Sequence, residues 1–202
     1  MAYSQSNTNN GMEILETGLV SVFSVPIGVY KIDANFEKIS KIIEEHPQQP
    51  NPVLLKKGTS NYTIKNIPDI LDNPEIGDLK KKLQTVVDDY ANNIGLKKLL
   101  ITDNWFANLK LGGRIEAHIH EHSAVSGTFY PKANGNSYLK FTNPTKNYRL
   151  VEQHNELTGF NTNTLSVKCE TGKVILFPSW LEHRVDEIDE DGRQVISFNC
   201  IH

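Results

Sequence analysis

Residues 114–122 read Arg-Ile-Glu-Ala-His-Ile-His-Glu-His and contain three of the seven histidines in the chain. If this stretch is a β-strand, His118 and His120 lie on the same face, one pleat repeat apart, and Ile115 lies on the opposite face. Two imidazoles placed in this way can reach one metal ion, and Fe, Zn, Cu and Ni all accept imidazole ligands. A solvated polar face that happens to contain histidines is the alternative, but three histidines at alternate positions favour a metal site.

The same stretch belongs to a series of short strand-like runs that fill the second half of the chain. From Leu99 onward there is no long helical pattern, and runs of β-branched and aromatic residues alternate with Gly, Asn and Pro clusters. Regular short strands of this kind predict a β-sandwich or a β-barrel. The predicted strands are residues 105–109, 114–120, 125–130, 137–141, 164–169, 173–177, 182–185 and 194–200.

The first half of the chain predicts two amphipathic helices. One has apolar residues at helical spacing between Phe36 and Ile43 and ends at His46-Pro47. The other begins at the cap and proline of residues 72–75 and continues to Ile94 before Gly95. Three further predictions are two short strands within residues 19–32, a loop at residues 47–51 and a loose terminus at residues 1–12.

Length and composition indicate one globular domain. The chain has 202 residues, of which 38% are hydrophobic and 22% charged, enough to bury a single core of normal size. No linker-like segment divides it, so we expect a single domain over residues 1–202. Its parts are a flexible N-terminus at residues 1–12, helical support with flanking strands at residues 13–97, and the β core at residues 98–202.

Charge and cysteine content narrow the class of partner. The net charge of −3 gives no basic field for nucleic acid, so no nucleic-acid partner is expected. The uncharged residues 17–30 are too short and too polar to span a bilayer, and the first positive charge is Lys31, so we expect neither a membrane segment nor a secretory signal. Two cysteines, Cys169 and Cys200, favour a reducing, cytoplasmic setting. Exposed edge strands make a homodimer a further expectation.

A second group of candidate site residues lies near the C-terminus. An apolar strand in residues 172–177 runs into a Pro-Ser-Trp turn and leads to His183. Ten residues later, Arg193 opens a strand in which it shares one face with Ser197 and Asn199. An Arg in an otherwise apolar strand is costly unless it pairs with an anion, and its planar fork suits a carboxylate. A surface salt bridge with an acidic residue of the segment 186–191 is the alternative.

Together, His118-x-His120, the distal His183 and Arg193 ten residues beyond it resemble the iron(II)- and 2-oxoglutarate-dependent oxygenase superfamily. The chain is most similar to a little-characterised branch of that superfamily found in bacteria and in phages of marine cyanobacteria. The resemblance covers about half the chain, from Trp105 to Asn199. It also rests on Trp105, Asn108, Ser126-Gly127-x-Phe129-Tyr130, Phe141-x-Asn143-Pro144, and the runs 172–180 and 193–199.

The resemblance implies a double-stranded β-helix, a cupin-like jelly-roll barrel with supporting helices, that holds Fe(II) in its mouth. It further implies 2-oxoglutarate as co-substrate and O₂ as oxidant, with hydroxylation of an unknown small-molecule or peptide substrate. By this resemblance His118 matches the first metal ligand and His183 the distal one, while Arg193 matches the residue that binds the far carboxylate of 2-oxoglutarate. A phage-encoded protein of this kind would work in the host cytoplasm.

Two positions depart from the superfamily pattern. The residue two after the first histidine is usually Asp or Glu, but here it is His120, so we predict a three-histidine site of His118, His120 and His183. Many members place a Ser two residues after the Arg, but here that position is Val195. The candidate hydroxyls for the co-substrate are instead Tyr130, Ser197 and Ser126.

Three other residues are candidates for the surroundings of the site. His122 has the parity to face it, and we expect it beside the ligands or the substrate rather than on the metal. Trp180 is expected either to wall the substrate pocket or to pack as a core aromatic. Asn108, part of the resemblance, is a candidate for a contact with the ligands or the substrate.

Two alternative functions fit the same residues. A three-histidine cupin-type dioxygenase binds its substrate directly to the iron without 2-oxoglutarate, and Arg193 would then hold a carboxylate of that substrate. A jelly-roll module that binds a metal without catalysis is the other alternative, and loss of the fold on chelation would favour it.

Overall fold

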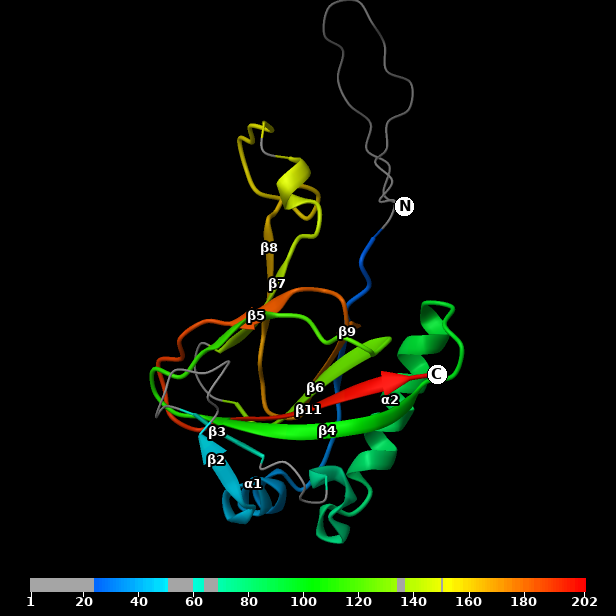
Figure 1. Ribbon diagram of the computed structural model, residues 1–202, viewed down its shortest axis with the longest axis vertical. Coiled ribbons are helices and arrows are strands. Elements are labelled where there is room, and N and C mark those ends of the chain that lie inside the picture. The colour runs from blue at the N-terminus through cyan, green and yellow to red at the C-terminus, as the bar shows by residue number, and fades with distance from the viewer. Residues whose placement is uncertain (1–23, 51–59, 64–68, 134–136, 150) are drawn as a thin grey trace, which may run out of the picture.

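The computed structural model describes residues 24–50, 60–63, 69–133, 137–149 and 151–202. Two antiparallel sheets form the body of the molecule (Figure 1). The large sheet has the strand order β1-β9-β6-β11-β4-β3-β2 and the small sheet has the order β5-β10-β7-β8. The elements are β1 (Gly28–Lys31), α1 (Phe36–Glu45), β2 (Gln48–Pro50), β3 (Ser60–Thr63), η1 (Ile70–Asp72), η2 (Pro74–Ile76), α2 (Leu79–Asn93), β4 (Leu100–Leu109), β5 (Ile115–His118), β6 (Val125–Lys132), β7 (Tyr138–Thr142), η3 (Lys146–Tyr148), β8 (Thr164–Lys168), β9 (Lys173–Pro178), β10 (His183–Val185) and β11 (Arg193–Ile201).

The last eight of these strands confirm the predicted jelly-roll. In chain order, β4, β6, β9 and β11 enter the large sheet, whereas β5, β7, β8 and β10 enter the small one. Neighbours in the large sheet are therefore far apart in sequence, as in the pairing of β11 with both β4 and β6. This crossing between sheets wraps the chain into a double-stranded β-helix and brings residues from both sheets to one cavity.

The helices cover the outer face of the large sheet (Figure 1). Helix α1 begins where the side chain of Asn35 accepts a hydrogen bond from the backbone N–H of Lys38, which satisfies one free donor of the first turn. Both helices turn their apolar faces toward Phe106, Phe129 and Phe198 of the sheet, which are fully buried. Buried residues of the helices are Ile39, Ile42, Ile43, Leu79, Leu83, Val86, Val87, Tyr90 and Ala91.

A second apolar cluster fills the space between the sheets. It includes Tyr130 and Phe177 from the large sheet and Phe141 from the small one. Because side chains alternate along a strand, β11 serves both clusters: Phe198 packs toward the helices and Val195 toward the interior.

The first half of the chain departs from the sequence predictions in two places. Residues 48–50 form strand β2 rather than part of a loop, because they pair with β3 at the edge of the large sheet. The second helix is divided, since Gly77 has a φ of 71° and separates the short turn η2 from α2. Of the two strands predicted in residues 19–32, β1 is present at 28–31, whereas residues 19–23 and the predicted loose terminus lie outside the described residues.

Strands β7 and β8 extend beyond the body of the barrel, and the segment between them carries η3 at its far end (Figure 1). This segment, residues 143–163, is called the arm here. Its apolar side chains Tyr148, Leu157 and Phe160 are exposed.

In the part of the chain that the structure describes, no helix has the length and apolar character needed to cross a membrane.

Gly127 marks a tightly packed point of the large sheet. It lies between Phe198 of β11 and Leu176 of β9, and a Cβ at this position would come within 2.2 Å of the Phe198 ring. We expect Gly127→Ala to lower the free energy of unfolding by about 1–3 kcal/mol, because a fully buried ring must move to make room. Urea denaturation measures the change.

Gly159→Ala is the matched control, because a Cβ there meets no atom within 4 Å. If Gly127→Ala and Gly159→Ala lost equal stability, the close packing of Gly127 between Phe198 and Leu176 would not be the cause of the loss.

Candidate metal centre

Two of the predicted ligands face each other in the small sheet. His118 is the last residue of β5 and His183 is the first residue of β10, and the two strands pair with these residues directly opposite. The centroids of their rings are 4.3 Å apart. His183 is almost fully buried because β10 lies between β5 and β7 and its ring also packs against Phe177.

The pairing of β5 with β10 contains a shift of register. His183 is opposite His118, but Val185 is opposite Ile115, so three steps along β5 match two along β10. Such an irregularity reverses which residues face inward, and Ile115 and His118 both line the cavity. The simple alternation predicted for residues 114–122 is therefore wrong. Glu116 is exposed instead, with Oε1 at 2.7 Å from Nε of Arg114.

His120 lies beyond the end of the strand rather than on it. Strand β5 stops at His118, and His120 is held in the next segment by a backbone hydrogen bond from its N–H to the carbonyl of Ser179, at 2.9 Å. Its ring lies 4.9 Å from that of His183, between centroids, and edge-on to Trp105. The three predicted ligands thus come together from three separate segments.

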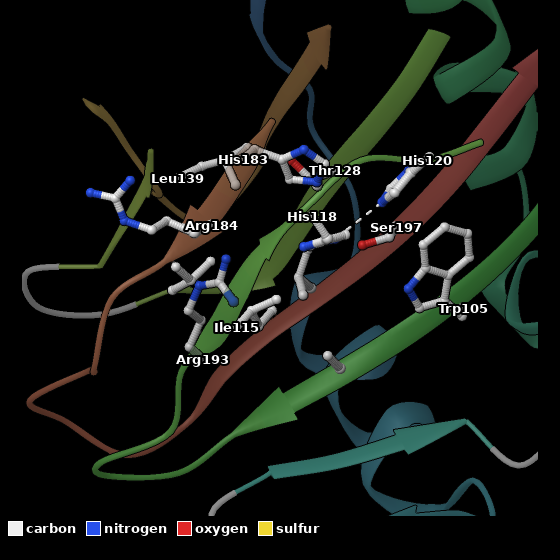
Figure 2. A pocket seen from close by; sticks show the side chains of 13 residues that line it. Trp105, Ile115, His118, His120, Thr128, Leu139, His183, Arg184, Arg193 and Ser197 are labelled. Atoms are coloured by element: carbon white, nitrogen blue, oxygen red, sulfur yellow. Dashed lines mark hydrogen bonds between the residues drawn. The ribbon is translucent and has the colours of Figure 1, made fainter. Parts of the chain in front are cut away.

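The geometry of the three imidazoles fits a metal ion (Figure 2). One nitrogen of each of the three rings lies within 4.8 Å of the other two, and Nε2 of His118 is 3.3 Å from Nε2 of His120. The Nδ1–H of His118 donates to the carbonyl of Glu116 at 2.8 Å, and that of His183 donates to the carbonyl of Leu181 at 2.9 Å. These bonds leave the lone pair of each Nε2 for the ion.

The protonation state of the three rings also fits metal binding. Burial, and to a smaller extent the neighbouring His118, lower the pKa of His120 to about 4 and that of His183 to about 3. Burial likewise lowers the pKa of His118. The rings are therefore neutral near pH 7, which is the form that binds a metal.

Arg193 lines the same cavity from the large sheet. It is 3% exposed, and its Nε and Nη1 have no hydrogen-bond partner among the described residues. Nη2 donates to Sγ of Cys169 at 3.9 Å, and the guanidinium carbon lies 5.2 Å from the centre of the Tyr130 ring. An always-charged group in this setting needs an anion from outside the described residues, and its fork suits a carboxylate.

The floor of the cavity is a row of side chains across three strands. Thr128 of β6 and Trp105 of β4 are both opposite Ser197 of β11, and all three line the cavity. The remaining lining is mainly apolar, and the empty space, including the part open to solvent, is about 540 Å³. Its further lining residues are Ala107, Ile115, Leu139, Arg184, Val185 and Val195.

Of the candidate hydroxyls, Ser197 faces the cavity and Tyr130 lies behind Arg193. The hydroxyl of Tyr130 accepts a hydrogen bond from Oγ1 of Thr128 at 3.0 Å, and burial raises its pKa far above the usual value, so it keeps its proton. Ser126 does not face Arg193. Its Oγ lies 2.7 Å from Nδ1 of His120.

Three predicted neighbours of the site lie elsewhere. His122 has a φ of 65° and its side chain is 94% exposed, because the chain turns away from the cavity after His120. Trp180 is 54% exposed and lines a separate surface groove, so it does not pack as a core aromatic. Asn108 alternates with Ala107 and Leu109, which face the interior, and so points to the opposite side of β4.

Asn199 and Asp103 are residues of the site that the sequence analysis did not identify. Oδ1 of Asn199 lies 2.9 Å from Nδ1 of His120, and its Nδ2 donates to Oδ2 of Asp103 at 2.8 Å. Alternation along β11 had placed Asn199 on the face of Arg193 and Ser197, which was the available signal. The contact with His120 needed the position of the turn after β5.

Part of the chain is similar to a known protein family. Residues 103–199, just under half of the chain, match the family model described as "Putative 2OG-Fe(II) oxygenase". No curated protein matches the chain.

Several solved structures share the fold. The epimerase SnoN in complex with Fe³⁺, alpha ketoglutarate and nogalamycin RO has a TM-score of 0.62 at 9% identity, over 88% of this chain and 79% of that one. A Pseudomonas putida prolyl-4-hydroxylase has a TM-score of 0.57 at 10% identity, over 89% and 94%. HygX from Streptomyces hygroscopicus with nickel, 2-oxoglutarate and hygromycin B bound has a TM-score of 0.54 at 11% identity, over 87% and 82%.

The low pKa values of the three histidines predict how stability depends on pH. Unfolded histidines take up protons near pH 6.5, whereas His120 and His183 resist protonation down to about pH 4 and 3. The unfolded state then binds more protons below pH 6.5, so the free energy of unfolding of the metal-free protein falls as the pH drops. We expect a loss of up to about 1.4 kcal/mol per histidine per pH unit, measured by urea denaturation between pH 7.5 and 5.

Carboxylates also titrate at low pH, so the variant His118→Gln/His120→Gln/His183→Gln serves as reference. Its stability should vary less with pH over this range than that of the unsubstituted protein. If the free energy of unfolding fell equally with pH in the two proteins, the prediction would be contradicted.

Proposed function

From the similarity of residues 103–199 to the 2OG-Fe(II) oxygenases, we propose that this protein is an Fe(II)- and 2-oxoglutarate-dependent dioxygenase that hydroxylates a small-molecule or peptide substrate. The observation that carries the proposal is one cavity lined both by three neutral, convergent imidazoles and by a buried guanidinium without an anionic partner among the described residues. A purely structural metal site would not need that guanidinium.

The metal ligands in this proposal are His118, His120 and His183. Each ring offers Nε2 to the ion and is steadied through Nδ1, twice by a backbone carbonyl and once by side chains. Three neutral ligands leave the charge of a divalent ion uncompensated by the protein. A doubly negative oxoacid is a suitable partner for such a site, because it brings the missing charge.

Arg193 binds the far carboxylate of 2-oxoglutarate. Its unpaired Nε and Nη1 would donate to that carboxylate, and burial strengthens the pair because little water competes with it. Ser197 offers a further donor from the cavity floor. The ring of Tyr130 lies against the guanidinium and supports it.

The apolar wall of the cavity keeps water away from the reacting groups. Ile115 and Val185 come from the small sheet and Val195 from the large one, so both sheets contribute to it. When bound, Fe(II) with 2-oxoglutarate and O₂ supplies an oxidation in which 2-oxoglutarate becomes succinate and CO₂ while a substrate C–H becomes C–OH. The protein contributes the ligands, the position of both substrates and the exclusion of water.

The test is an anaerobic titration of the metal-free protein with Fe(II) and then 2-oxoglutarate, followed by visible absorption. We expect a weak charge-transfer band when the oxoacid chelates the bound iron. Arg193→Ala should abolish the band at the same oxoacid concentration while Fe(II) still binds, and His183→Ala should abolish Fe(II) binding. His122→Ala is the control and should change neither, because this side chain is exposed.

The other outcomes separate the competing functions. Binding of Fe(II) without a band would reject the oxoacid and favour a dioxygenase whose own substrate binds the three-histidine iron. No binding of Fe(II) would reject both enzymes and leave a metal-binding or structural module.

A further inference from the structure

A row of polar side chains crosses the large sheet directly beneath His120. Asn199 of β11 is opposite both Asp103 of β4 and Ser126 of β6. Nδ2 of Asn199 donates to Oδ2 of Asp103 at 2.8 Å, and Oδ1 of Asn199 accepts from the hydroxyl of Ser126 at 2.8 Å. The row continues to Oγ of Ser179, 2.8 Å from Oγ of Ser126.

The carboxylate of Asp103 determines which way the Asn199 amide faces. A carboxylate only accepts hydrogen bonds, so the NH₂ group of Asn199 must point toward Asp103. The amide oxygen must then point toward His120, whose Nδ1 is 2.9 Å away. Ser126 agrees with this orientation, because its hydroxyl can donate to the same oxygen.

An amide oxygen in this position selects one form of the His120 ring. It accepts hydrogen bonds only, so Nδ1 of His120 must carry the proton and Nε2 must carry the lone pair. His118 and His183 obtain the same form from backbone carbonyls, which side-chain substitutions leave in place. Only for His120, of the three, does the form of the ring depend on side chains.

We propose that Asn199, oriented by Asp103, is a positioning residue that fixes His120 with its proton on Nδ1, so that Nε2 can serve as the third metal ligand. A released amide could rotate and present its NH₂ group to Nδ1. The proton would then move to Nε2, and His120 would no longer be able to bind an ion. The consequence for the metal rests on the proposed function, whereas the form of the ring does not.

The first measurement is made on the metal-free protein. Long-range proton–nitrogen correlation NMR of ¹⁵N-labelled histidines distinguishes the two forms of each neutral ring, and His120→Gln identifies the signals of that residue. We expect a single Nδ1–H form for His120 in the unsubstituted protein. Asp103→Ala and Asn199→Leu should each give a mixture or the Nε2–H form. His118 and His183 should keep Nδ1–H throughout.

The second measurement is the affinity for Fe(II) without any co-substrate. We expect Asp103→Ala and Asn199→Leu to bind Fe(II) about 10- to 100-fold more weakly, as is typical when a group that orients a ligand is lost. The exchanged pair Asp103→Asn/Asn199→Asp should restore both the Nδ1–H form and the affinity. It places an acceptor beside His120 and a donor at position 103.

Asp88→Ala is the matched control. Asp88 accepts a hydrogen bond from the amide of Gln84 at 2.9 Å, so it is another carboxylate that binds a side-chain amide, but no histidine lies beyond that amide. It should leave the form of His120 and the Fe(II) affinity unchanged. Asp103 is exposed, so its substitution by Ala tests the proposal even if Asn199→Leu fails to fold.

Two results would overturn the inference. One is a His120 ring that stays in the Nδ1–H form in both single variants. The other is a loss of affinity that the exchanged pair does not reverse. If the unsubstituted protein binds no Fe(II) while the ring form still follows Asp103 and Asn199, the proposed function fails and the positioning of His120 stands.

Discussion

The register between β5 and β10 is the constraint on which the metal centre depends. It sets His118 opposite His183, and the extra residue in β5 turns Ile115 inward and Glu116 outward. A regular pairing would have placed Glu116 on the cavity side of β5. The register shift therefore keeps the Glu116 carboxylate away from the metal ligands.

The two sheets supply different residues to the cavity. The small sheet supplies His118 and His183, whose rings are steadied by carbonyls two residues earlier in the chain. The large sheet supplies Arg193 and, through Asn199, the support for His120. A ligand that spans the cavity from the histidines to Arg193 would therefore connect the sheets. The helices stand behind the large sheet and keep it in place.

The sequence predicted the elements better than their details. The strands β4 to β11 follow from short β-branched runs, and the metal ligands follow from histidine spacing and from a family resemblance. Three local bends were not predictable. The register shift in β5, the positive φ of His122 and the turn that exposes Trp180 depend on how neighbouring strands end. Asn108 is misplaced for a simpler reason, since a motif position does not say which face of β4 it occupies.

The arm between β7 and β8 contributes no side chain to the cavity lining among its described residues, although β7 itself contributes Leu139. Its outer part, around the exposed Leu157 and Phe160, can therefore vary without touching the cavity, whereas Lys146 at its base pairs with Glu182, next to His183. Insertions and deletions are tolerated most readily in such exposed segments. In this architecture the chemistry and the surface around it can evolve separately, and related chains can diverge in the arm while they keep the same centre.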